Sequence, residues 1–187
     1  MPPIVKITKN DIIQTSLNLI RANGIDGINA RSIASAMGCS TQPIFSNFSS
    51  MEELEETITV AAYELYLDFL RRETESGKYP QYKSFGMAYI RFADEEKQLF
   101  KLLFMRDRRG EDLTPTADFE TSVQIIMDSC GVSREIASLM HMEMWACVHG
   151  IGTMLATSFL TLDWELISNM LTDVYQGIRA RHLSEDK

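Results

Sequence analysis

The sequence predicts an all-α protein in which a short three-helix head is followed by a larger helical body. Three observations carry this prediction. Apolar residues recur at intervals of three, four and seven along much of the 187-residue chain. Ser, Thr and Asn residues that can start a helix are each followed by a helix-length segment, and a Gly or Pro then ends it. Strand-like alternation of apolar and polar residues never extends beyond a few residues.

The first helix is expected between Thr8 and Asn23. Thr8 and Asp11 fit a capping box, in which each side chain bonds to the other residue's backbone. Gly24 supplies the break that ends this helix, and Asn29 can cap the second one. The buried face of the first helix should hold Ile13, Leu17 and Ile20.

Residues 31–48 are predicted to form two short helices joined by a tight turn. Gly38 can take a positive φ at the turn, Ser40 can cap the later helix, and Pro43 fits its first turn. The side chains expected to face inward are Ile33, Ala34, Met37, Ile44 and Phe48. Those left outside, small and polar, are Thr41, Gln42, Ser46 and Asn47. A buried helix pair that exposes a polar surface is typical of the helix-turn-helix, a DNA-binding motif.

A long connecting helix is expected over residues 51–76, because Ser50 and Glu53 form a strong start signal and Gly77 a stop. Its apolar face is predicted to hold Met51, Leu54, Ile58, Ala61, Leu65 and Phe69. Further helices are expected at 81–93, 95–105, 117–129, 133–159 and 162–181, with a charged surface loop over 106–115. The head is therefore assigned to residues 1–50 and the body to residues 51–187.

Charge is distributed unevenly along the chain. Residues 1–50 carry four basic and two acidic side chains, a net charge of +2. Because the whole chain has a formal charge of −8, the remainder carries −10. A mildly basic head on an acidic body is compatible with docking of one end on phosphate.

Composition and motifs favour a cytoplasmic protein. The N-terminus has no apolar segment typical of a signal peptide. Residues 144–162 lack charged side chains, but their polar residues favour a buried helix over a membrane span. Cys39, Cys130 and Cys147 form neither a CxxC motif nor an even set, so no disulfide framework or zinc site is indicated.

The head resembles that of TetR-family transcriptional regulators over about residues 8–54. The residues that carry the resemblance are Ile33-Ala34, Gly38-Cys39-Ser40, Ile44-Phe45-Ser46-Asn47-Phe48 and Ser50-Met51-Glu52-Glu53-Leu54. In that family the corresponding blocks read I-A, G-V-S, L-Y-x-H/Y-F and S-K-E-E-L, in the same order and at the same spacing. Residues 145–150 are similar to the W-x-x-x-H-G signature of one subgroup of the family's C-terminal domains.

The resemblance implies a homodimeric regulator, by family default a repressor, that binds a palindromic operator and is released by a small, largely apolar effector. Three positions depart from the family pattern. Phe45 replaces a tyrosine and has no hydroxyl for a phosphate, and Asn47 replaces His or Tyr. Met51 replaces a lysine, so that phosphate contact would rest on backbone N–H groups and Ser50. A shallow salt dependence follows, since each neutralised phosphate contributes roughly −0.9 to the slope.

Carried over position by position, the residues that would face the major groove or its walls are Thr41, Gln42, Pro43, Ser46 and Asn47. Gln42 is the best candidate for a base edge, because its amide can pair with adenine N6 and N7, although it can also be a merely solvated residue. Arg31 and Lys9 are candidates for phosphate contacts or simple solubilising charges. The full predicted DNA-binding set is Lys9, Arg31, Ser40, Thr41, Gln42, Pro43, Phe45, Ser46, Asn47 and Ser50.

The resemblance also implies an effector pocket and a dimer interface in the body. The predicted pocket lining, which can equally be plain core, is Phe85, Tyr89, Phe92, Phe100, Phe104, Met127, Met144, Trp145 and His149. Trp145 and His149 stand out because they share a helix face and each has a polar atom that needs a partner. The predicted interface, formed by the last two helices, is Gly150, Gly152, Ala156, Ile167, Met170, Leu171, Val174 and Ile178.

The alternatives to a DNA-binding regulator are an enzyme and a helical protein-interaction module. An enzyme is not expected, because no Ser/His/Asp constellation, Gly-rich phosphate loop or metal cluster is visible and the chain has three histidines. No cofactor or metal is expected either. A helical protein-interaction module that has lost DNA binding stays open, because Phe45 and Met51 weaken the expected phosphate contacts.

Overall fold

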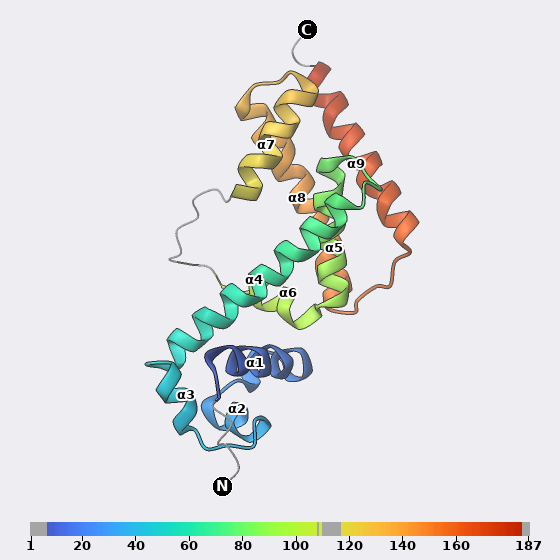
Figure 1. The fold of residues 1–187 in the computed structure, drawn as a ribbon. Coiled ribbons are helices and arrows are strands. Elements are labelled where there is room, and N and C mark those ends of the chain that lie inside the picture. Colours follow the sequence, from blue (N-terminus) through green and yellow to red (C-terminus); the bar gives the residue numbers. More distant parts are fainter. Residues whose placement is uncertain (1–6, 108, 110–116, 185–187) are drawn as a thin grey trace. The chain divides into compact units, whose positions relative to one another are not determined.

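The computed structural model describes residues 7–107, 109 and 117–184 (Figure 1). Within these residues every regular element is a helix and none is a strand, which confirms the all-α prediction. In chain order the elements are α1 (Lys9–Asn23), the 3-10 helix η1 (Ile25–Gly27), α2 (Ala30–Ala36), α3 (Gln42–Asn47), α4 (Met51–Glu75), α5 (Gln81–Glu95), α6 (Lys97–Phe104), α7 (Ala117–Cys130), α8 (Arg134–Ala156) and α9 (Trp164–Ser184).

The helices expected after residue 80 are all present, with ends that differ from the predicted ones by at most three residues. Local signals explain this agreement. Ser133 caps α8 by accepting a hydrogen bond from the Ile136 N–H, and Gly131 takes a φ of +69° in the break before it. Most of the predicted 106–115 loop, residue 108 and residues 110–115, lies outside the described residues.

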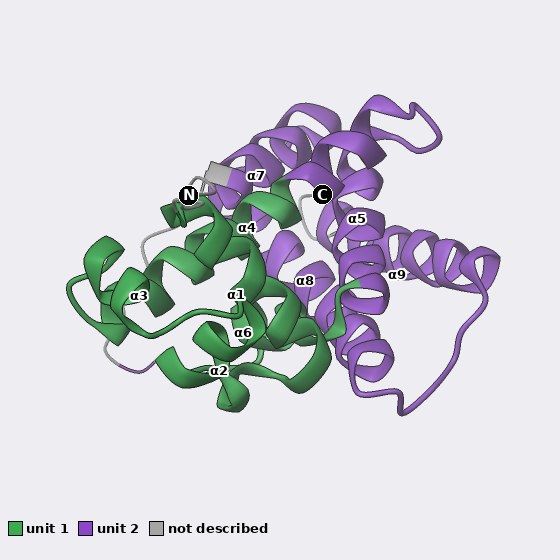
Figure 2. Ribbon diagram, turned by 60° about the horizontal axis from the view of Figure 1, so that its bottom comes forward, with its two compact units in different colours: residues 1–67, 96–106 green, residues 68–95, 107–187 purple. Residues whose placement is uncertain are grey.

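The chain divides into two compact units (Figure 2). Unit 1 comprises residues 1–67 and 96–106, and unit 2 comprises residues 68–95 and 107–187. Unit 1 thus contains the predicted head together with the first part of α4 and helix α6. The predicted body supplies the rest of the chain, which forms unit 2.

Helix α1 is the central helix of unit 1 and packs against α2, α3 and α6. Its capping box is present: the Asp11 N–H donates to Thr8 Oγ1 at 3.1 Å, and the Thr8 N–H donates to Asp11 Oδ2 at 2.9 Å. The buried face holds Ile12 in place of the predicted Ile13, which is only half-buried. Two guanidinium bonds of 2.8 Å join Arg21 to Glu96, directly before α6, and fix α6 on α1.

The buried stripe of α4 differs from the predicted one. Leu54, Ile58 and Phe69 are buried as expected, but the residues between them are Ala62 and Tyr66, not Ala61 and Leu65. Within unit 1, the Tyr66 ring packs edge-on against the Phe104 ring of α6, with 5.3 Å between the centroids. This contact removes apolar surface of both rings from water.

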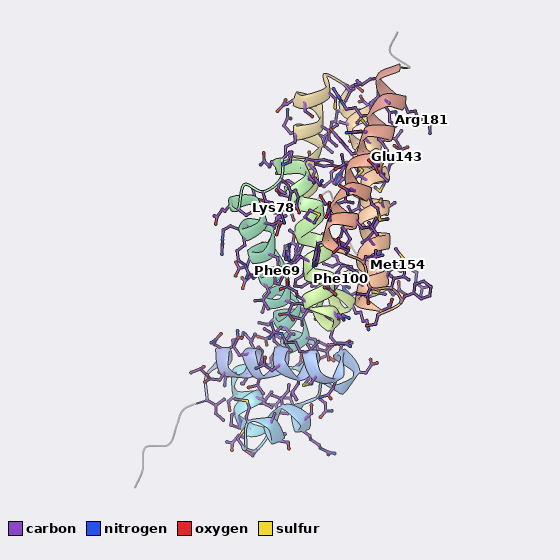
Figure 3. The ribbon with its side chains drawn as sticks, turned by 90° about the vertical axis from the view of Figure 1, so that its right-hand side faces the viewer. Phe69, Lys78, Phe100, Glu143, Met154 and Arg181 are labelled. Atoms are coloured by element: carbon purple, nitrogen blue, oxygen red, sulfur yellow. The ribbon has the colours of Figure 1, made fainter. Side chains whose placement is uncertain are left out.

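Unit 2 is built around α8, which packs against α5, α7 and α9. Gly86 of α5 permits this packing, because a Cβ there would lie 3.2 Å from Val148 and 3.3 Å from Leu171. At the other end of unit 2, the buried His182 of α9 lies 3.1 Å from the carboxylate of Glu143, which is labelled in Figure 3. These contacts make α8 the helix on which the side chains of unit 2 are positioned.

Candidate functional sites

The turn between α2 and α3 is a Schellman motif. Gly38 has a φ of +65°, its N–H donates to the Ser35 carbonyl at 3.2 Å, and the Cys39 N–H donates to the Ala34 carbonyl at 3.0 Å. A Cβ on Gly38 would meet nothing within 4 Å, so the backbone angle alone favours glycine here. The turn directs the chain into α3 as the Gly38 pattern predicts.

Helix α3 begins without the expected side-chain cap. Its N-cap residue is Thr41, not Ser40, and no side chain bonds to the helix start. Pro43 does lie in the first turn, as predicted. Ser40 is exposed one residue before the cap.

The outward surface of α3 combines polar side chains with one aromatic ring. Gln42 and Ser46 are exposed, and the Phe45 ring is 53% exposed. Ile44 and Phe48 are buried, as predicted. The remaining predicted groove residues, Thr41, Pro43 and Asn47, are half-buried.

Two polar side chains of α3 bond within their own helix. The Ser46 hydroxyl donates to the Gln42 carbonyl at 2.9 Å, and the Asn47 amide donates to the Pro43 carbonyl at 2.8 Å. Such back-bonding to the fourth preceding residue is common for short polar side chains. The exposed Gln42 amide forms no hydrogen bond with the described residues, so its N–H groups and its oxygen are open to a partner.

The residues predicted to contact phosphate differ in the interactions that they form in the structure. Lys9 forms an ion pair with Glu53, with 3.2 Å between Nζ and Oε1, and lies 4.5 Å from the centre of the Phe48 ring. Arg31 is exposed on the first turn of α2. Ser50 accepts a hydrogen bond from the Glu53 N–H at 3.2 Å, as expected of a cap. Of the two basic candidates, Arg31 is the one that has no carboxylate partner among the described residues.

Unit 2 contains a second candidate site, a cluster of aromatic side chains on α5 and α8. The Trp145 and His149 rings stack, 4.8 Å apart and 12° from parallel. His149 Nδ1 lies 2.8 Å from the hydroxyl of Tyr89, which is buried. The Trp145 side chain is 44% exposed and covers one edge of the cluster. The structure thus brings together three of the nine residues predicted to contact an effector.

Burial keeps this cluster uncharged. It raises the pKa of the Tyr89 hydroxyl and lowers the pKa of the His149 imidazole, since a buried charge loses its hydration. At neutral pH the tyrosine is therefore protonated and the histidine neutral. Such a surface suits an uncharged aromatic or apolar ligand better than an ion.

Thr153 extends the cluster along α8, one turn beyond His149. Its Oγ1 atom is shielded from solvent and has no hydrogen-bond partner among the described residues. An unsatisfied buried hydroxyl costs about 1–3 kcal/mol. Thr153 is not among the predicted site residues, although its spacing of four from His149 could have indicated it.

The other predicted pocket residues have the following surroundings within their own units. Phe100 and Phe104 belong to unit 1, where their rings pack 5.3 Å apart. Phe92 packs edge-on against Phe69 in the core of unit 2. Met144 is buried, and the half-buried residues are Phe85 and Met127. Phe92 and Met144 are thus core residues in this structure, which is the alternative that apolar periodicity left open.

The predicted dimer interface needs a correction. Gly152, Ala156, Ile167 and Leu171 are buried inside unit 2 and have no surface to offer a partner chain. Gly150 has open space beside it, whereas Met170, Val174 and Ile178 are half-buried. The open face of α8 instead exposes Leu139, Met142 and Ala146, one helical turn apart and in line with Gly150. Small residues on α8 serve mainly to pack it within its own unit.

Among residues 7–107, 109 and 117–184, no group of three or more His, Cys, Asp or Glu side chains is placed to hold a metal ion. None of the helices found there is long and apolar enough to cross a membrane. The sequence matches no protein-family model and no curated protein.

Proposed function

We propose that this chain is a sequence-specific DNA-binding transcriptional regulator, acting as a homodimeric repressor that a small, largely apolar effector releases from its operator. The observation that carries the proposal is the α2–α3 pair. Two short helices are joined by a Gly38 turn, their apolar sides are buried, and an uncharged face with the open Gln42 amide points outward. A helix of this kind fits the major groove, where Gln can form two hydrogen bonds with adenine.

The first test is fluorescence anisotropy with DNA from upstream of the protein's own gene, at several salt concentrations. The wild type is expected to bind tightly and to weaken as salt rises. Gln42→Ala should weaken binding to the specific site about tenfold and leave non-specific binding unchanged, because one bidentate base contact is worth roughly 1–3 kcal/mol. Gln176→Ala, an exposed glutamine of α9 in unit 2, is the matched control and should bind as the wild type does.

Absence of binding at low salt, both to that DNA and to a randomised palindrome library, would contradict the proposal. In that event the alternative is a helical protein-interaction module. Two observations favour it: Glu53 already neutralises Lys9, and an apolar ring, Phe45, is exposed on α3. Weak binding at low salt that does not depend on DNA sequence would support this alternative.

The proposed effector site is the cluster of Tyr89, Trp145 and His149, extended by Thr153. A flat, neutral aromatic surface beside an unsatisfied hydroxyl supports a largely apolar effector with one hydrogen-bonding group. An effector shifts the equilibrium away from the DNA-binding conformation only to the extent that its affinity is higher for a conformation that does not bind DNA. A compound that releases DNA from the wild type should therefore lose this effect in Trp145→Ala, while DNA affinity without the compound stays unchanged.

A further inference from the structure

The exposed aromatic ring on α3 has no evident structural role. Positions 42, 45 and 46 are three and four residues apart, so Gln42, Phe45 and Ser46 share the outward face of the helix. The Phe45 ring is 53% exposed, while Ile44 and Phe48 on the opposite side supply the buried contacts of α3. The fold therefore does not require a phenyl ring at position 45, and water is an unfavourable surrounding for it.

The neighbours of Phe45 narrow what this face can recognise. The Ser46 hydroxyl already donates its proton to the Gln42 carbonyl, and one N–H of the Asn47 amide donates to the Pro43 carbonyl. No charged side chain occurs between Arg31 and Glu52. The Gln42 amide forms no hydrogen bond with the described residues and the Phe45 ring is exposed, so these two side chains are the most open to direct contact.

A phenyl ring neither donates nor accepts a conventional hydrogen bond, so it can distinguish base pairs only by apolar contact. On the major-groove edges of the bases, nitrogen and oxygen atoms are donors or acceptors, and the prominent apolar group is the C5-methyl of thymine. The methyl group of 5-methylcytosine offers the same chemistry. Both sources place a methyl group at pyrimidine C5.

We infer that Phe45 is a specificity-determining residue that recognises a pyrimidine C5-methyl group, supplied by thymine, next to the base contacted by Gln42. This inference rests on the proposed DNA-binding function and adds to it a defined chemical feature of the operator. In a two-fold operator the methyl group would occur once in each half-site.

The test uses the full chain and the site that it selects from a randomised DNA library. Each thymine of that site is replaced in turn by deoxyuridine, which pairs identically but lacks the methyl group. Burial of one methyl group accounts for about a fourfold change in affinity. Wild-type affinity should therefore fall about fourfold for one thymine in each half-site, measured by fluorescence anisotropy.

In Phe45→Ala the same deoxyuridine replacement should have no effect, because the contact is already lost. The matched control is Val60→Ala, which removes an exposed apolar side chain of the same unit from α4. Val60→Ala should keep the full sensitivity to deoxyuridine. Circular dichroism of each variant checks that the helices are intact.

The outcomes separate this inference from the function on which it rests. If no site is selected and no DNA binds at low salt, both fail. If a site is bound but deoxyuridine affects the wild type and Phe45→Ala equally, or if neither deoxyuridine nor 5-methylcytosine changes the affinity of either protein, DNA binding stands and the role of Phe45 is overturned. If only a 5-methylcytosine in place of cytosine raises wild-type affinity, and Phe45→Ala lacks that gain, the methyl group is recognised but comes from methylated cytosine.

Discussion

Glu53 joins three segments of unit 1 through one carboxylate. Its Oε2 accepts hydrogen bonds of 2.7 Å from both the N–H and the hydroxyl of Ser49, and its Oε1 lies 3.2 Å from Lys9 Nζ. The carboxylate also sits in the first turn of α4, where the helix dipole favours negative charge. The Ser49 hydrogen bonds, followed by that from Lys9, hold the pKa of Glu53 at about 2. Ser50 accepts a hydrogen bond from the Glu53 N–H as predicted, but the Glu53 carboxylate bonds to the backbone N–H of Ser49 instead of that of Ser50.

This pKa makes the contribution of Glu53 to stability dependent on pH. The folded-state pKa of about 2 is below the usual 4.5, so the unfolded chain takes up the proton first as the pH falls. The stabilisation is thus complete above pH 4.5 and is lost between pH 4.5 and 2. Glu53→Gln should lower the melting temperature at pH 7, and its difference from the wild type should shrink through this window.

Thermal unfolding followed by circular dichroism from pH 7 to pH 2 measures this difference. Glu56→Gln, an exposed carboxylate three residues further along α4, is the control and should melt as the wild type does. A gap between wild type and Glu53→Gln that stays constant down to pH 2 would show that the carboxylate charge is not responsible.

At the scale of elements, substitution of two glycines with equally open surroundings is expected to change the free energy of unfolding in opposite directions. A Cβ on Gly38 or on Gly177 would meet nothing within 4 Å. Gly38 has a φ of +65° in the turn before α3, whereas Gly177 lies inside α9 without a positive φ. Gly38→Ala should lower the free energy of unfolding by about 1–2 kcal/mol, the cost of a left-handed L-residue.

Gly177→Ala should instead raise the free energy of unfolding by about 0.5–1 kcal/mol, because alanine loses less entropy than glycine in a helix. Urea titration followed by circular dichroism gives both values. Equal changes in the two variants would mean that the turn conformation of Gly38 is not what determines its residue type.

Most helices could be predicted from local sequence signals. Which face of a helix is buried was harder to predict, because it depends on packing between helices. Thr8, Asn29 and Ser133 cap helices where the sequence places them, because a cap depends on residues only three apart. Tyr66, which is buried on α4 where Leu65 was predicted, contacts Phe104, almost forty residues later. Periodicity identifies a helix but cannot choose between two adjacent apolar stripes.

The candidate sites were predictable to the same limited extent. The outward position of Gln42 follows from the inward position of Ile44, so short-range spacing was enough. The ion pair of Lys9 with Glu53 joins residues far apart in the chain and could not be foreseen from either neighbourhood. Similarly, small residues such as Gly152 indicate close packing but not whether the neighbour belongs to the same chain.

At the scale of the whole molecule, the proposed function requires two copies, because a two-fold operator needs two α3 helices. Within the described part of unit 2, the open face of α8 offers one apolar surface for association, with Leu139, Met142, Ala146 and Gly150. Apolar surface also continues at the connection to α9, where the Phe159 side chain is 75% exposed. Dimerisation would remove these side chains from water, and the small Ala146 and Gly150 would let two copies of α8 approach closely.

Ala146→Glu is therefore expected to convert a dimer into a monomer in sedimentation velocity at micromolar concentration. A carboxylate placed at the centre of an apolar contact meets its own copy across the two-fold axis, and burial of two unpaired like charges opposes association. Ala22→Glu, the same change on an exposed alanine of α1 in unit 1, should leave the oligomeric state unchanged. The DNA affinity of Ala146→Glu should fall at least tenfold on a two-fold site but remain unchanged on a half-site, since each α3 is intact. If Ala146→Glu stays dimeric, the open face of α8 is not the dimer interface. If the wild type is a monomer, the homodimeric part of the proposed function is wrong.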